Sequence, residues 1–327
     1  MMTDLDKSIW QDESVPKIVV CGLKRSGKSS ILRVLFNKLS PHETMYLEST
    51  SVPTFVNMMR ASKNPLLNVA IAEIPGNWGW EESESIDSLF FANCQSLIIV
   101  IDSSSSEEIS PAAISLAKRV IARANKVKQN IHLHIFLNKV DANFRFDPDS
   151  VQAETNKAKF MEAVLASIDD SGNISAHCTS IFDNSIHEAF SKVIQKPLLA
   201  NGKIEQILDV IVTSCRLEKA VLFDLVSKLT LGSDSSQIES NTFALMQDLL
   251  DVIADMIGIY SPVSALAGKT NCNIALSNGE VIYVRIIQAP HLALVCIVKA
   301  EMFEKTFLLN HNIDSFRNSL MRIVSFT

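Results

Sequence analysis

The sequence predicts two domains in succession: a doubly wound α/β domain with a mostly parallel sheet, followed by a smaller α+β domain. Up to residue 196, continuous apolar strands alternate with amphipathic helices, the pattern of a parallel sheet covered on both faces. After Lys196-Pro197, helices surround a group of short strands instead. A chain of 327 residues is also long enough for two cores. We therefore place a tail over 1–15, the first domain over 16–196 and the second over 197–327.

Apolar runs and helical periodicity give the elements of the first domain. The connection over 38–60 contains Pro41 and Pro53, so we expect a long mobile connection there rather than a core element. The expected strands cover 16–21, 66–73, 96–101, 131–137 and 174–178, and the expected helices cover 30–36, 112–124, 153–168 and 181–194.

In the second domain, Ser277-Asn278-Gly279 marks a hairpin turn. The apolar face of a helix over 242–260 and a strand over 281–287 are expected to serve as both core and interface, because a small α+β layer rarely covers both sides of its sheet. The other expected elements are helices over 204–215 and 303–323, an extended segment over 219–230, and strands over 272–276 and 292–298.

Composition excludes several classes of function. The net charge is -6 and the pI ≈ 5.7, so no overall field draws the chain to nucleic acid or anionic lipid. The six cysteines form no Cys-x-x-Cys pair, which favours a reducing compartment such as the cytoplasm. We recognise no signal peptide, spanning apolar run or lipidation box, and expect contact with a membrane only through partners.

A phosphate-binding loop opens the first domain. Gly22-Leu23-Lys24-Arg25-Ser26-Gly27-Lys28-Ser29 fits the pattern G-x-x-x-x-G-K-[ST], between an apolar strand and a helix. Its glycines let backbone N–H groups turn toward a di- or triphosphate at the helix N-terminus. Lys28 adds a positive charge on the terminal phosphates, and Ser29 offers its hydroxyl to Mg²⁺. The residues assigned to the phosphates are Lys24, Arg25, Ser26, Gly27, Lys28, Ser29 and Ser30.

A guanine signature, N-K-x-D, follows a later strand as Asn138-Lys139-Val140-Asp141. Asp141 can accept from both N1–H and the exocyclic amine of guanine, which adenine does not offer, while the Lys139 stem lies over the base. Asn138 would tie this loop back to the phosphate loop. One strand further on, a backbone amide of the Ser180-Ile181 loop would reach the guanine carbonyl oxygen. Such a tetrapeptide also forms ordinary turns, but its place downstream of a phosphate loop favours guanine.

The segment Glu73-Ile74-Pro75-Gly76-Asn77 occupies the place of a D-x-x-G-Q element, in which Gly76 would sense the γ-phosphate. Glu73 replaces the aspartate that holds Mg²⁺, so its longer stem must fold back or coordinate indirectly. Asn77 replaces the glutamine that orients the attacking water and is one methylene shorter. Lys24 stands where fast enzymes of this type have glycine, and its side chain crowds the line of attack.

These departures predict very slow unaided hydrolysis of GTP. A water-positioning glutamine or an arginine finger contributes roughly 10³ to 10⁵ in rate, and no finger is evident. Turnover faster than roughly one per minute would contradict this prediction. The alternative is that a relaxed backbone lets Glu73 and Asn77 perform the usual roles.

The chain resembles the Rag GTPases, and within them the C/D type. The resemblance spans both domains and rests on the phosphate loop with Ser30, Leu47-Glu48-Ser49-Thr50, Ile74-Pro75-Gly76, the run TSIFDNSIHEAFSKV over 179–193 and the run EKAVLFDLVSK over 218–228. It implies a Ras-like GTPase domain that binds GTP or GDP with Mg²⁺, and a roadblock-like second domain. It also implies that Thr50 is the first-switch threonine. The resulting catalytic assignments are Lys28, Thr50 and Asn77, and the metal assignments are Ser29, Thr50 and Glu73.

The resemblance further implies an obligate heterodimer with a Rag A/B-type GTPase, joined through the second domain. Members of the family relay amino-acid sufficiency to a component of the TOR kinase complex at the lysosomal membrane surface, where a Ragulator-like scaffold holds them and an activating protein stimulates hydrolysis. In the C/D subunit the signalling form is expected to contain GDP. The chain departs from the family at Glu73, at Asn77 and in the segment between Thr50 and Glu73.

Two other functions stay open. A P-loop ATPase or kinase is disfavoured by the N-K-x-D signature at 138–141. A nearly static scaffold, in which bound nucleotide only stabilises the fold, would bind partners equally in the GTP- and GDP-loaded forms.

Overall fold

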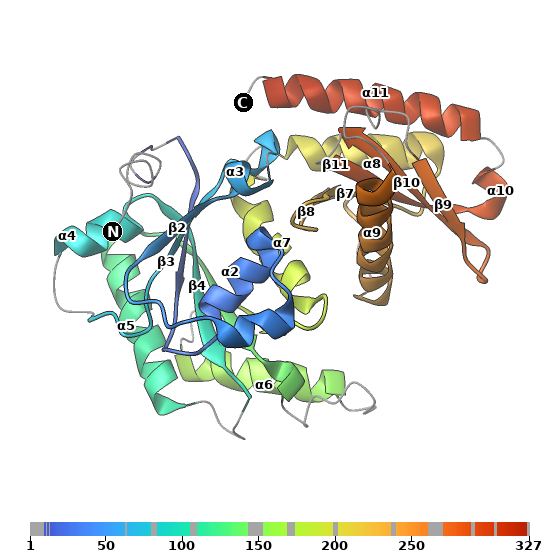
Figure 1. Cartoon of the computed structure of the whole chain (residues 1–327). Coiled ribbons are helices and arrows are strands. Elements are labelled where there is room, and N and C mark those ends of the chain that lie inside the picture. Colours follow the sequence, from blue (N-terminus) through green and yellow to red (C-terminus); the bar gives the residue numbers. More distant parts are fainter. Residues whose placement is uncertain are drawn as a thin grey trace. The chain divides into compact units, whose positions relative to one another are not determined.

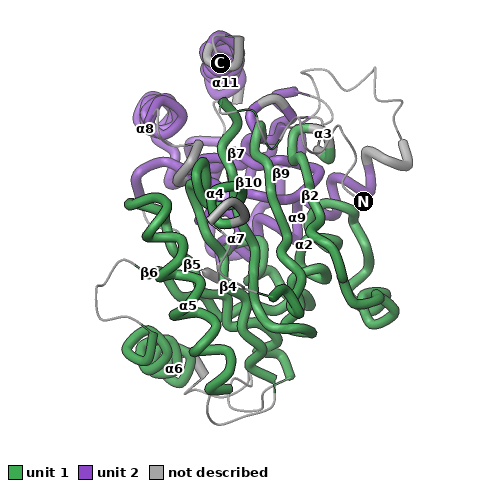
Figure 2. The backbone as a smooth tube through the Cα atoms, turned by 90° about the vertical axis from the view of Figure 1, so that its left-hand side faces the viewer, with its two compact units in different colours: residues 1–61, 68–189 green, residues 62–67, 190–327 purple. Residues whose placement is uncertain are grey.

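The computed structural model divides the chain into two compact units, coloured separately in Figure 2. Unit 1 contains residues 1–61 and 68–189, and unit 2 contains residues 62–67 and 190–327. The structure describes residues 10, 12, 14–62, 64–79, 84–104, 110–142, 153–168, 174–198, 202–236, 240–260, 271–288, 292–303 and 306–325.

Unit 1 is built on a six-stranded sheet in the order β2-β3-β1-β4-β5-β6. Every neighbouring pair is parallel except β2 and β3, so the predicted mostly parallel sheet is confirmed. Val20 pairs with Glu73, so β1 and β3 end within a residue of each other. The strands β4, β5 and β6 end together, where Asp102 pairs with Asn138 and Asn138 with Thr179. The strands are β1 (Lys17–Cys21), β2 (Thr54–Asn57), β3 (Ala70–Glu73), β4 (Cys94–Asp102), β5 (His132–Asn138) and β6 (Ile174–Thr179).

Helices cover both faces of this sheet (Figure 1). Alternate strand residues such as Val19, Leu97 and Ile135 form a core with α4, α5 and α6. The residues between them, such as Val20 and Ile98, are also buried and alternate to the opposite face of the sheet. The helices are α2 (Lys28–Asn37), α3 (Met58–Ser62), α4 (Glu84–Phe91), α5 (Pro111–Val127), α6 (Ala153–Ile168) and α7 (Ser185–Leu198), with short 3₁₀ turns η1 (Pro41–Tyr46), η2 (Pro65–Leu67) and η3 (Val140–Ala142).

The connection over 38–60 contains more regular structure than the sequence predicts. It includes η1, β2 and α3, and β2 pairs with β3 from Thr54 opposite Glu73 to Asn57 opposite Ala70. The prediction of a connection without a core element is therefore wrong. This edge strand has only four residues, all partly exposed, so no hydrophobic alternation could reveal it. The strand expected over 66–73 begins only at Ala70, because η2 precedes it, and the eight-residue helix α4 was not predicted.

Unit 2 contains a five-stranded antiparallel sheet in the order β8-β7-β11-β10-β9, and its predicted α+β class is confirmed. The predicted hairpin turn joins β9 to β10, with Gly279 at a φ of 84°. The extended segment over 219–230 proves to span β7 and the start of β8. The elements are α8 (Lys203–Cys215), β7 (Lys219–Asp224), β8 (Thr230–Ser233), α9 (Ser240–Tyr260), β9 (Asn271–Ala275), β10 (Glu280–Gln288), β11 (Leu292–Lys299), α10 (Ala300–Phe303) and α11 (Thr306–Ser325).

Both faces of this second sheet are also covered within the unit (Figure 1). On one face, α9 packs against the strands through residues such as Met246 and Leu250. On the other face, α11 receives hydrogen bonds from Arg285 of β10, at 2.6 Å to Asn310 and 2.7 Å to Asp314. The strand β10 is buried from Val281 to Ile287. The prediction that this strand also serves as an interface is therefore wrong, because α8 and α11 supply the second cover.

Residues 62–67 lie between β2 and β3 in the chain but belong to unit 2. Asn64 is fully buried there and donates from Nδ2 to Oδ1 of Asp224 at 2.9 Å. Asp224 also accepts from the N–H and the hydroxyl of Ser227, at 2.7 and 2.6 Å. The β2–β3 connection is thus fixed at its middle by a buried polar network. Among the helices that the structure describes, none is long and apolar enough to cross a membrane.

Candidate functional site

A cavity of about 580 Å³ opens at the edge of the unit 1 sheet where β1, β3, β4, β5 and β6 end. Most residues that the sequence assigns to a nucleotide line it, namely Lys24, Arg25, Gly27, Lys28, Ser29, Ser30, Thr50, Glu73, Gly76, Asn138, Lys139, Asp141 and Ile181. Ser26, Ser180 and Asn77 do not line it. Ser26 and Ser180 lie buried behind the wall, whereas Asn77 is exposed to solvent.

The phosphate loop wraps the amine of Lys28. Its Nζ donates to the backbone oxygens of Gly22 and Leu23, each at 3.0 Å. Burial lowers the pKa of Lys28, and the nearby Glu73 carboxylate partly offsets this by favouring the charged ammonium. Gly27 has a φ of 100°, and a Cβ there would lie 2.2 Å from Nδ2 of Asn138. Only glycine therefore lets the phosphate loop approach the loop at the end of β5 this closely.

The loop after β5 is fixed by a set of side-chain bonds. Asn138 donates from Nδ2 to the backbone oxygen of Ser26 at 2.9 Å, which joins it to the phosphate loop. Lys139 donates from Nζ to Oδ2 of Asp102 at 2.5 Å and to the backbone oxygen of Arg25 at 2.7 Å. Its stem thereby crosses one wall of the cavity.

Asp102, the residue after the strand expected over 96–101, received no role from the sequence. Burial tends to raise the pKa of Asp102, but bonds from Lys139 and Ser104 outweigh it and hold the pKa below its ordinary value. The carboxylate is therefore charged and orients Lys139. An aspartate directly after a buried apolar strand was the available signal.

Asp141 is oriented from behind by a serine on the next loop. The hydroxyl of Ser180 donates to Oδ1 of Asp141 at 2.5 Å and accepts from the N–H of Phe182 at 3.0 Å. Ser180 is fully buried, so its side chain holds the aspartate and does not itself enter the cavity. Ile181, its neighbour, does line the cavity.

Four side chains form a hydroxyl and carboxylate cluster on the metal side of the loop. Ser29 Oγ lies 2.8 Å from Thr50 Oγ1 and donates to Oε1 of Glu73 at 2.5 Å. Thr50 donates to the same Oε1 at 3.5 Å, and Thr54 donates to Oε2 at 3.1 Å. Glu73 is buried, with 3% exposure.

The donor set of this cluster fits Mg²⁺. Adjacent ligands of an octahedral Mg²⁺ at about 2.0–2.1 Å lie about 2.9 Å apart, close to the Ser29–Thr50 separation. The bond from Ser29 places the Glu73 carboxylate behind that hydroxyl, as a group that orients a ligand would lie.

Gly76 lies directly against the phosphate loop. A Cβ at Gly76 would stand 2.3 Å from the backbone N of Lys24 and 2.4 Å from its Cα. No other residue fits this contact without moving one of the two segments.

The residues directly after Gly76 lie outside the cavity lining. Trp78 packs on the core and meets Phe90 edge-on at 6.2 Å. Asn77 is exposed and does not line the cavity.

The rim includes residues that sequence reasoning did not assign. Thr44, Met45, Ala142 and Phe182 line the cavity. The ring of Phe182 lies 5.3 Å from that of His42, so the loop after β6 and the start of η1 meet across the rim. Phe182 follows the predicted Ile181 directly, and this adjacency was the only sequence signal for it.

Comparison with known proteins gives consistent matches. The family model described as the Gtr1/RagA G protein conserved region matches residues 17–257. Ras-related GTP-binding protein C of Mus musculus is 33% identical over 321 residues, covering 95% of this chain and 78% of that protein. Ras-related GTP-binding protein D of Mus musculus is 34% identical, covering 96% and 69%. The GTP-binding protein gtr2 of Schizosaccharomyces pombe is 32% identical, covering 94% and 98%.

Among solved structures, Myxococcus xanthus MglB matches 39% of this chain and 98% of its own, with a TM-score of 0.31 and 16% identity.

Proposed function

This chain belongs to the Gtr1/RagA family of G proteins as a GTPase of the C/D type, and from that premise we propose how its cavity binds nucleotide and what it assembles with. The cavity takes GTP or GDP, with Asp141 selecting guanine and the phosphate loop holding the phosphates. The observation that supports this most directly is that both signature loops line one cavity and are bonded to each other through Asn138 and Ser26.

The residues around the cavity divide the work of binding phosphate, sensing the γ-phosphate and holding Mg²⁺. Lys28 faces the terminal phosphates, and Gly76 senses the γ-phosphate from its place against the phosphate loop. Ser29 and Thr50 hold Mg²⁺, which when bound neutralises charge on the β- and γ-phosphates. Asn77 stays outside the cavity lining, so hydrolysis is slow until an activating protein supplies what is missing.

Nucleotide specificity tests this proposal directly. The purified full chain should bind a fluorescent GDP analogue that GTP and GDP displace and ATP does not. Asp141→Asn should lose about 100-fold or more in guanine affinity and gain affinity for xanthine nucleotides, because the amide can donate to the xanthine C2 carbonyl where the carboxylate could not. Displacement by ATP as effective as by GTP would instead support a kinase or ATPase.

For assembly, we propose a heterodimer with a Rag A/B-type GTPase through unit 2. The outer side of α9 presents Leu245, Val252 and Met256, which are 42%, 55% and 51% exposed. Their spacing of seven and four residues places them on one face of the helix. An apolar stripe of this kind suits the face of a partner domain. Val252→Glu with Met256→Glu should abolish co-purification with a co-expressed A/B-type subunit, whereas Val210→Glu on α8, which is 64% exposed but outside the stripe, should not.

At the level of the cell, we propose that the heterodimer relays amino-acid sufficiency to the TOR kinase complex at the lysosomal surface, held there by a Ragulator-like scaffold. Family membership supports this step, and co-localisation of the tagged full chain with lysosomes in fed and starved cells tests it.

A further inference from the structure

We propose that Glu73 is a positioning residue that ties the first switch (residues 47–54) to the phosphate loop, so that Thr50 stays against Ser29 with GDP as well as with GTP. This inference rests on the nucleotide site proposed above. It concerns how the first switch is held closed. The aspartate that the family usually has at position 73 would not hold the switch in the same way.

Glu73 bonds two segments at once. Its Oε1 accepts from Ser29 in the phosphate loop, and its Oε2 accepts from Thr54 at the end of the first switch. Thr50, within the switch, lies 2.8 Å from Ser29 and also reaches Oε1. The first switch is therefore held at two points, and every one of these bonds is made between atoms of the chain.

The length of the Glu73 side chain determines which of these bonds can be made together. Thr54 and Glu73 are paired on adjacent antiparallel strands, so their side chains leave the sheet side by side. Ser29, the partner of the other oxygen, lies on a different element, at the start of α2. Glutamate spans from its own strand to Ser29 while its second oxygen stays beside Thr54. Aspartate is shorter by one methylene, about 1.5 Å, and so cannot keep both bonds without moving a strand or the loop.

The energy of the Glu73 bonds determines how firmly the first switch is held. Glu73 is a buried carboxylate that accepts bonds from hydroxyls, and bonds to a charged acceptor are worth more than bonds between neutral groups. Losing one such bond shifts an equilibrium by roughly tenfold or more. In a switch closed only by the γ-phosphate, no contact would hold Thr50 against Ser29 when GDP is bound. Here the bonds through Glu73 remain in both nucleotide states.

Hydrogen exchange of the first switch tests this inference. The full chain is loaded with GDP or with a non-hydrolysable GTP analogue, in excess Mg²⁺, and exchange of the amides over 47–54 is measured by mass spectrometry. For the wild type we expect the two rates to agree within about twofold. For Glu73→Asp and Thr54→Val we expect the GDP form to exchange at least tenfold faster than the GTP-analogue form, because γ-phosphate then becomes the main closing contact.

Thr54→Ser is the matched control, because it keeps the hydroxyl and should restore the wild-type pattern. A wild-type difference of tenfold or more between the two nucleotides would overturn the inference, as would Glu73→Asp and Thr54→Val variants that both behave like wild type. Failure of the wild type to bind either nucleotide would instead remove the proposed function itself, and the loading step detects that before exchange begins.

Discussion

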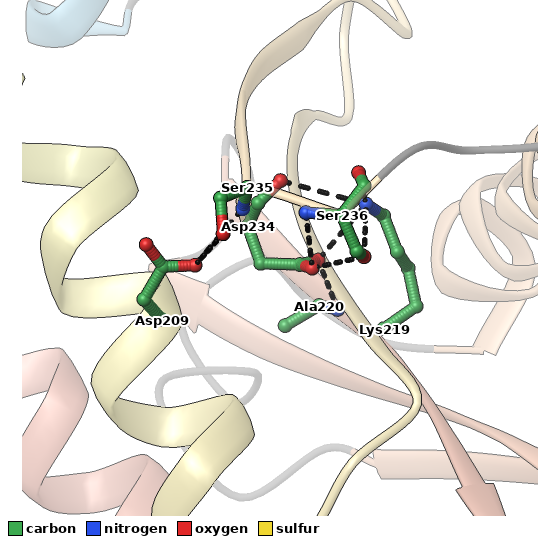
Figure 3. A network of polar contacts seen from close by, with 6 residues as sticks. All are labelled: Asp209, Lys219, Ala220, Asp234, Ser235 and Ser236. Carbon is green, nitrogen blue, oxygen red and sulfur yellow. Dashed lines mark hydrogen bonds and ion pairs between the residues drawn. The ribbon is translucent and has the colours of Figure 1, made fainter.

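Each unit buries one carboxylate close to a lysine, and the two carboxylates are satisfied in opposite ways. In unit 2, Asp234 pairs with the ammonium of Lys219 at 3.1 Å and accepts from the Ala220 N–H at 3.0 Å and from Ser236 (Figure 3). Lys219 also donates to the Ser236 hydroxyl at 2.8 Å. In unit 1, the bonds of Glu73 are to hydroxyls, and no ion pair of Glu73 occurs among the described residues.

This difference separates a structural charge from a functional one. The charge of Asp234 is cancelled in place by its lysine, so little field remains to act on a ligand. Glu73 has no direct ion pair among the described residues and is hydrogen-bonded to neutral hydroxyls, although its charge favours the charged form of the nearby Lys28. A carboxylate of this kind at the edge of a cavity attracts a cation into it. Mg²⁺ is the cation that the Ser29 and Thr50 hydroxyls fit.

The largest effect that this comparison predicts is on stability. Lys219→Met should lower the free energy of unfolding of unit 2 by about 3–5 kcal/mol, because it leaves the Asp234 charge buried without its partner. Hydrogen exchange of the β7 and β8 amides in the full chain would measure this locally. Glu73→Gln should cost unit 1 no more than about 1.5 kcal/mol, since its hydroxyl partners remain hydrogen-bonded.

Lys299→Met supplies the matched control for the lysine. Lys299 forms an ion pair with Glu218 at 3.1 Å, but these side chains are 64% and 46% exposed. Its loss should cost less than about 1 kcal/mol. If Lys219→Met were as mild as Lys299→Met, the description of Asp234 as a charge that needs its partner would be wrong.

The next largest effect is on ligand binding, where the variant in unit 1 should have the larger effect and the variant in unit 2 almost none. Glu73→Gln should weaken Mg²⁺-dependent GTP binding by roughly 10- to 100-fold, the usual cost of removing a group that orients a metal ligand. Lys219→Met should change this affinity by less than about twofold at a temperature where unit 2 stays folded. Titration of Mg²⁺ against a fluorescent GTP analogue separates the two variants. Equal losses in both would contradict the assignment of Glu73 to the metal side of the cavity.

The two networks also differ in how far the sequence could predict them. Glu73 was assigned from the sequence because it stands at a fixed position of a motif that is defined by its distance from a glycine. Asp234 and Lys219 belong to no such motif, and they meet only because β7 and β8 pair. The bonds that Glu73 makes were equally beyond sequence reasoning, because Thr54 lies in an edge strand of four residues that was predicted as a loop.

The same contrast holds for the fold. The buried strands of unit 1 can be recognised in the sequence as apolar runs. The helix expected over 153–168 is found at those residues as α6. The elements that were missed, β2, α3 and α4, are short and partly exposed, and their existence depends on neighbours that only the folded sheet provides. The first switch (47–54) is a loop that runs into one of these elements, β2, at Thr54, which is why its geometry needed the structure.

The smallest expected effect is a pH dependence confined to unit 2. Burial tends to raise the pKa of Asp234, but the Ala220 N–H, the Ser236 hydroxyl and the Lys219 ammonium outweigh it and hold the pKa below its ordinary value. The folded chain therefore binds this proton less readily than the unfolded chain. The stability from Asp234 is fully present above the ordinary pKa and is lost as pH falls through the lowered one.

Local unfolding of β7, followed by hydrogen exchange from about pH 6 to about pH 3, should show this loss at the acidic end. The double variant Lys219→Met, Asp234→Asn removes both the titrating group and its partner, so its stability should fall less steeply over the same range. The attraction between Asp234 and Lys219 contributes both to the lowered pKa of Asp234 and to the stability that Lys219→Met removes. A wild-type slope no steeper than that of the double variant, together with a full penalty for Lys219→Met, would mean that Lys219 stabilises β8 through Ser236 and not through the charge of Asp234.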